Sequence, residues 1–90
     1  MRGGADKISY DKLEQMLNAD GLMNDFLLRY NNVRKQKVNT FQEFKDGYDQ
    51  NGKVIRITEF TSMIGLDENE IKLGTKMARL VLTLRTMVDE

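Results

Sequence analysis

The chain has 90 residues and carries fourteen basic and fourteen acidic side chains, so its formal net charge is zero. It contains no cysteine, which excludes disulfides, thiolate metal sites and thiol nucleophiles, and no histidine, the commonest metal ligand and general base. We therefore expect a non-enzymatic protein with no metal, no other cofactor and no small-molecule substrate.

A chain of this length forms one small domain, which we expect to span residues 1–90, with residues 1–7 as a disordered tail. Its apolar runs are too short to cross a bilayer, and its first residues lack the apolar segment of a signal peptide. The sequence thus predicts a cytoplasmic protein that does not interact with membranes.

Amphipathic spacing and capping residues predict three helices in the N-terminal half. Ser9 is a candidate N-cap for the first helix, which we expect to end at Gly21, where a left-handed conformation is available. The second helix is expected over about 22–35, because apolar residues recur there at three- and four-residue spacing. A capping box that starts at Thr40 opens a third, short helix.

A turn at 49–52 and a β-branched segment at 53–57 follow the third helix. The segment is typical of one short strand. The only nearby candidates for a partner strand are the residues before the turn. We therefore expect strand pairing to be minimal or intermolecular. The turn also resembles an EF-hand calcium loop. Gly47 and Thr58 occupy two of the ligand positions, however, and an ordinary turn accounts for the same residues.

The C-terminal half is expected to contain a short helix capped by Thr58 and then a long one. Asp67 opens the long helix with a second capping box, and we expect it to continue almost to the end of the chain. The predicted fold class is therefore mainly α. It has about five helices, one short strand, a long C-terminal helix and a C-terminal half that is like a helix-turn-helix.

An apolar stripe with alternating four- and three-residue spacing follows the last helix. The apolar stripe consists of Leu73, Met77, Leu80, Leu84 and Met87. Such spacing occurs in helices that pack on their own core and also at the a and d positions of helix–helix interfaces. The stripe is therefore either core or an interface with a partner, including a second copy of the chain.

Cations dominate the same helix, because residues 71–88 contain four basic and no acidic side chains. Lys72, Lys76 and Arg79 share one face, which lies about 120° from the apolar stripe on an α-helix. A solvated face and a face that contacts phosphates are both compatible with this pattern.

The segment from Ile57 to Lys76 resembles the helix-turn-helix of DNA-binding regulators, and the strand before it is similar to that of the winged-helix variant. The resemblance is carried by apolar positions and a turn glycine, Phe60, Ile64, Gly65, Leu66 and Ile71. It implies that the helix beginning near residue 67 enters the major groove, with Asn69 reading bases and lysines on phosphates.

The sequence thus predicts a small regulator of transcription that binds double-stranded DNA, as a dimer. The candidate nucleic-acid contacts are Asn69, Lys72, Lys76, Arg79 and Arg56. The alternative is a small helical adaptor or inhibitor that binds a protein partner through the apolar stripe, whose methionine side chains adapt to irregular surfaces.

Overall fold

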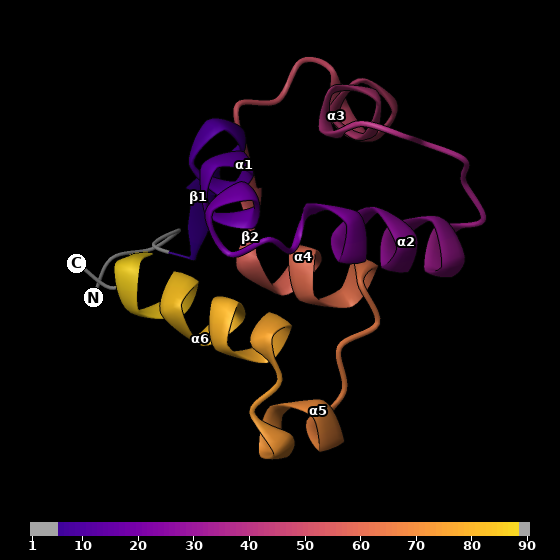
Figure 1. Ribbon diagram of the computed structural model, residues 1–90. Helices are drawn as coiled ribbons and strands as arrows, with labels where there is room; N and C mark the ends of the chain where they lie inside the picture. Colours follow the sequence, from indigo (N-terminus) through magenta and orange to yellow (C-terminus); the bar gives the residue numbers. More distant parts are fainter. Residues whose placement is uncertain (1–5, 89–90) are drawn as a thin grey trace.

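Six helices and two short strands follow one another in the computed structural model, which describes residues 6–88, with side chains as far as residue 86 (Figure 1). They are β1 (Lys7–Ser9), α1 (Tyr10–Ala19), α2 (Met23–Arg34), α3 (Phe41–Asp49), β2 (Val54–Arg56), α4 (Ile57–Met63), α5 (Glu68–Leu73) and α6 (Lys76–Val88). The expectation of a mainly helical fold is confirmed. No helix in the described residues is long and apolar enough to cross a membrane.

The partner expected for the strand is wrong, because β2 pairs with β1 and not with the residues before the turn. The two strands are antiparallel, and Ile8 lies opposite Ile55 with both side chains buried. The N–H of Ile57 also donates to the carbonyl of Asp6 at 2.7 Å, which extends the pairing by one bond. Lys7, expected in a tail, is therefore a strand residue, whereas residues 1–5 lie outside the described part of the chain.

Three of the expected N-caps are confirmed by hydrogen bonds from backbone N–H groups to capping side chains. The bonds join Lys12 to Ser9 at 3.1 Å, Glu43 to Thr40 at 3.1 Å and Glu70 to Asp67 at 3.0 Å. Each cap satisfies a donor that the first turn of a helix leaves without a partner. The expected cap at Thr58 is wrong, because α4 begins at Ile57 and Thr58 is already inside its first turn.

The turn predicted at 49–52 is present and is stabilised by its own side chain. The carboxylate of Asp49 accepts the N–H of Asn51 at 3.3 Å, and the N–H of Gly52 donates to the Asp49 carbonyl at 3.0 Å. Within the described residues, no group of three His, Cys, Asp or Glu side chains could hold a metal ion.

All four phenylalanines are buried in the core that α2, α3 and α4 share. The ring of Phe26 lies edge-to-face with that of Phe44, with centroids 4.9 Å apart, and is stacked with that of Phe60 at 5.6 Å. Aromatic pairs of this kind add about 0.5–1.5 kcal/mol beyond the burial of their area. These contacts fix the three helices relative to one another.

The expectation of one continuous helix from Asp67 is wrong, because the chain breaks at Gly74. This residue has a φ of +68° and follows Leu73, the last residue of α5. Glycine adopts the left-handed conformation without the steric penalty of a Cβ, and helices commonly end in this way. A new helix then begins, with the hydroxyl of Thr75 accepting the N–H of Ala78 at 3.3 Å.

The break divides the apolar stripe into two parts with different surroundings. Met77, Leu80 and Leu84 lie on α6 and are at most 2% exposed, so they belong to the chain's own core. The interpretation of these three residues as a partner or dimer interface is therefore wrong. Leu73 lies on α5 and is 78% exposed. The side chain of Met87 lies outside the described part.

Helix α5 buries none of its residues, unlike α1, α2, α3 and α4. Figure 1 shows it apart from the other helices, at the lower edge of the view. The packing of an apolar face is what usually holds a helix on a domain. Because α5 lacks such a face, polar contacts must contribute to its position.

Candidate nucleic-acid interface

The five residues predicted to contact nucleic acid are all exposed, and they lie in two places. Asn69 and Lys72 are on α5, and Lys76 and Arg79 are at the start of α6. Arg56 ends β2, at the opposite end of α4 from the turn that leads to α5. Four of the five residues therefore belong to one continuous segment, and Arg56 is separate from it.

These cations also differ in their partners. Arg56 forms an ion pair with the carboxylate of Asp6, with 3.7 Å between nitrogen and oxygen. Lys72, Lys76 and Arg79, which we call the basic strip, form no ion pair with any carboxylate of the described residues. The charges of the basic strip are therefore available to an anion from outside.

Part of the basic strip lines a surface cavity of about 330 Å³. Lys76 and Arg79 form one side of it, and Ala19 and Asp20 at the end of α1 form the other. The C-terminal end of α1, where the helix dipole is negative, and one acidic residue thus share this cavity with the two cations. Two cations against one carboxylate leave an excess of positive charge at this point of the surface.

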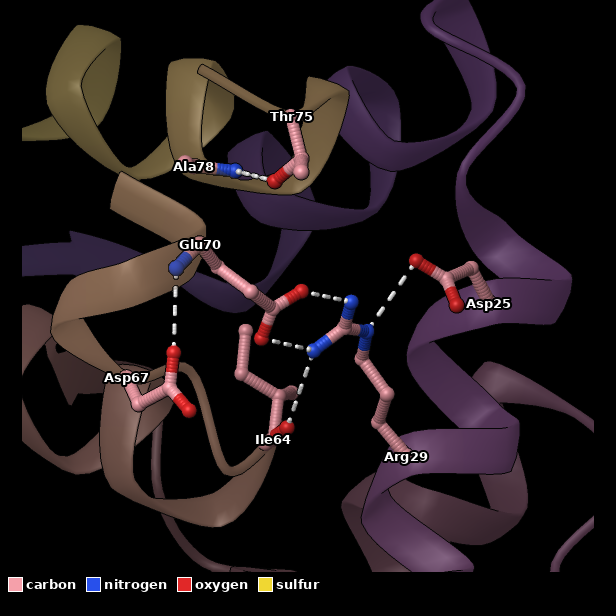
Figure 2. A network of polar contacts seen from close by, with 7 residues as sticks. All are labelled: Asp25, Arg29, Ile64, Asp67, Glu70, Thr75 and Ala78. Carbon is pink, nitrogen blue, oxygen red and sulfur yellow. Dashed lines mark hydrogen bonds and ion pairs between the residues drawn. The ribbon is translucent and has the colours of Figure 1, made fainter. Parts of the chain in front are cut away.

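Arg29 of α2 connects α5 to the rest of the domain (Figure 2). Its guanidinium donates to both carboxylate oxygens of Glu70, with 3.0 Å between Nη1 and Oε1. It also donates to the carbonyl of Ile64 at 3.4 Å and to the carboxylate of Asp25 at 3.1 Å. We call these four groups the Arg29 clamp. The planar fork of an arginine suits such a two-bond contact with a carboxylate.

The Arg29 clamp is partly shielded from water, because the side chains of Arg29 and Glu70 are each only 24% exposed. The hydrogen bond from Arg29 lowers the pKa of Glu70 below its ordinary value of 4.5. The same bond raises the pKa of Arg29 above its ordinary value. Both shifts favour the charged forms of the two groups, which is the form in which they attract each other.

The turn between α4 and α5 lies against the same helix α2. Gly65, in this turn, has a φ of +65°, and a Cβ on it would lie only 3.1 Å from Cγ2 of Val33. Arg29 and Val33 are one helical turn apart, so one side of α2 contacts both the turn and the carboxylate of α5. A glycine at this position gives the conformation and the space that the close approach requires.

The clamp changes the charge at the start of α5. Asp67, Glu68 and Glu70 put three carboxylates there, and carboxylates repel the phosphates of a nucleic acid. Asp67 is engaged in capping α5, and Glu70 is neutralised by Arg29. Asp67 and Glu68 are then the exposed carboxylates of this turn, and neither forms an ion pair with another described residue.

The sequence prediction does not include Arg29. The spacing of Asp25 and Arg29, four residues apart on one helix, is a signal for a local ion pair. Glu70 is 41 residues further along the chain than Arg29, and no local pattern indicates which carboxylate it meets.

Comparisons of the chain with protein-family models, with curated proteins and with solved structures found no match. Helix α4, a turn with Gly65 and helix α5 follow one another along the chain.

Proposed function

We propose that the chain is a small, non-enzymatic, cytoplasmic regulator of transcription that binds duplex DNA with α5 and the start of α6. The observation that carries this proposal is the basic strip. Lys72, Lys76 and Arg79 are exposed and have no carboxylate partner among the described residues. Such cations attract the phosphate backbone and supply most of the affinity of a DNA-binding surface.

The apolar stripe and the candidate nucleic-acid contacts differ in exposure, and this difference favours DNA over a protein partner. A partner that binds the apolar stripe needs these side chains at the surface, yet Met77, Leu80 and Leu84 are core. A DNA contact needs polar side chains at the surface, and the basic strip and Asn69 meet that requirement. The formation of a dimer through α6 is not part of the proposal, for the same reason.

Within the proposed contact, the residues have different roles. The basic strip neutralises phosphates, which fixes the position of the protein on the duplex. The amide of Asn69 has both a donor and an acceptor, which suits a two-bond contact with the major-groove edge of adenine. The Arg29 clamp neutralises one negative charge, that of Glu70, in the first turn of α5, which is the end that approaches the DNA in this proposal.

The proposal is tested by measuring the fluorescence anisotropy of a labelled DNA duplex over a series of salt concentrations. If the three cations each neutralise one phosphate, the logarithm of the association constant falls against that of the salt concentration with a slope of about −2.7. A fourfold rise in salt then weakens binding about 40-fold. We expect Lys72→Ala to weaken binding and to make the slope shallower by about 0.9.

The matched control is Lys12→Ala, which removes the same charge from an exposed position on α1. It should leave the slope unchanged. A protein that binds no duplex at low salt, or a Lys12 variant that loses as much affinity as the Lys72 variant, would contradict the proposal.

A protein partner remains the second candidate, because five large apolar side chains of the described residues are exposed, and two of them are exposed by more than half. Leu28 on α2 is 69% exposed, and Leu73 on α5 is 78% exposed. An adaptor that uses these residues should lose its partner on Leu73→Arg while its fold stays unchanged. A gain of DNA affinity in that variant, from the cation added beside Lys72, counts instead for the interface on α5.

A further inference from the structure

Helix α5 lies between two glycines in the left-handed conformation. Gly65 precedes it with a φ of +65°, and Gly74 follows it with a φ of +68°. A glycine populates positive and negative φ about equally, so the chain on either side of it can change direction at little cost. Helix α5 also buries none of its own residues. An element with flexible connections and few buried contacts can move relative to the rest of a domain.

The Arg29 clamp spans the first of these glycines. The guanidinium contacts the carbonyl of Ile64 on one side of Gly65 and the carboxylate of Glu70 on the other side. One side chain of α2 is thus bonded to the end of α4 and to α5 at the same time (Figure 2). Half-buried Leu66 adds an apolar contact with the core before α5 begins.

The clamp also determines which face of α5 is directed outward. Successive residues of an α-helix are separated by about 100° around its axis. If Glu70 is directed at α2, then Asn69 lies about 100° and Lys72 about 160° away from that direction. The predicted base-reading and phosphate-contacting side chains are therefore presented away from the domain, in agreement with their exposure.

We propose that Arg29 is a positioning residue that latches α5 in the orientation in which Asn69 and Lys72 face the DNA. This inference rests on the proposed function. Arg29 does not contact the DNA in this scheme, because its guanidinium is directed at Glu70, Asp25 and the carbonyl of Ile64, which accept four of its five N–H groups. Its loss should release α5 without removing a phosphate contact.

The test compares Arg29→Met with the wild type by amide hydrogen exchange and by DNA binding over the salt series. The loss of charge-assisted bonds should make exchange of the α5 amides at least about tenfold faster, with the amides of α1 to α4 unchanged. DNA affinity should fall by about the same factor at every salt concentration. The salt slope should stay that of the wild type, unlike that of Lys72→Ala.

Two further variants separate the latch from general effects on charge or folding. Arg34→Met removes the same charge from the exposed last turn of the same helix, and should alter neither exchange nor affinity. Glu70→Gln keeps the shape of the partner and removes its charge, so it should also release α5. In the double variant of Arg29 and Glu70, the second change should add little to the first, as expected for coupled residues.

Unchanged exchange of the α5 amides in Arg29→Met would overturn the latch. Faster exchange together with an unchanged DNA affinity would overturn the positioning role. A wild-type protein that binds no DNA overturns the proposed function, and the exchange of α5 still decides separately whether Arg29 holds this helix.

Discussion

Replacement of Gly74 by alanine tests the break between α5 and α6. The glycine has a φ of +68°, and a Cβ added to it meets no atom within 4 Å, so the cost is conformational and not steric crowding. An alanine held in the left-handed conformation costs about 1–2 kcal/mol. In a domain of this size, about 1 kcal/mol corresponds to a fall in melting temperature of about 4–8 °C.

The variant could also relieve its strain by joining α5 and α6 into the continuous helix that the sequence predicts. Alanine favours a helix over glycine by only about 1 kcal/mol. A straight helix would draw Glu70 away from Arg29, and hydrogen bonds to charged groups contribute about 1.5–3 kcal/mol each. We therefore expect Gly74→Ala to keep the break and to lose stability.

The assay is thermal unfolding followed by circular dichroism, with Gly47→Ala as the matched control. Gly47 is inside α3, has no positive φ and has no atom within 4 Å of an added Cβ. The control should gain about 0.5–1 kcal/mol, since glycine is unfavourable inside a helix. A Gly74→Ala variant that melts higher than the wild type and gains helical signal would refute the reasoning, because it would show a continuous helix in solution.

Two further predictions concern the core. Leu84 is 0% exposed and Leu73 is 78% exposed. In a urea titration, Leu84→Ala should therefore lower the free energy of unfolding by about 2–5 kcal/mol, whereas Leu73→Ala should change it by no more than about 0.5 kcal/mol. Similar losses in the two variants would contradict this difference in exposure. Burial, and next the charge of Asp49, raise the pKa of Tyr10 from 10.0 to about 12. The folded chain thus holds the proton of Tyr10 more tightly than the unfolded chain does. The contribution of this group to the free energy of unfolding is therefore fully present below pH 10 and is lost as pH rises toward 12. Tyr10→Phe should remove that part of the loss, and a variant that follows the wild-type curve would exclude Tyr10 as its source.

The elements that could be predicted from the sequence are those with local signals. Capping side chains act on N–H groups two or three residues away, so Ser9, Thr40 and Asp67 mark their helix starts without knowledge of the fold. The pairing of β1 with β2 escaped prediction because β1 has only three residues, and one of them, Ser9, also caps a helix. A short strand of this kind has too little alternation to be recognised.

The errors in the candidate site have a related cause. The spacing of the apolar stripe continues across Gly74, so periodicity alone hides a change of direction that one left-handed residue produces. The three cations of the basic strip are exposed, as is usual for charged side chains, but the break at Gly74 divides the single helix face on which they were expected, with Lys72 on α5 and the other two on α6. The Arg29–Glu70 contact depends on how two distant segments pack, which no spacing within either segment reveals.

The pairing of β1 with β2 also bears on the order in which the domain assembles. Lys7 lies opposite Arg56, so the chain between them, with α1, α2 and α3, forms a closed loop. Closing a long loop has an entropic cost that must be met before its few strand contacts return any free energy. The aromatic contacts of α2 with α3 join segments much closer in sequence. We therefore expect the helices to associate first and the sheet to close the loop afterwards, with α6 docking on β1 as a late step.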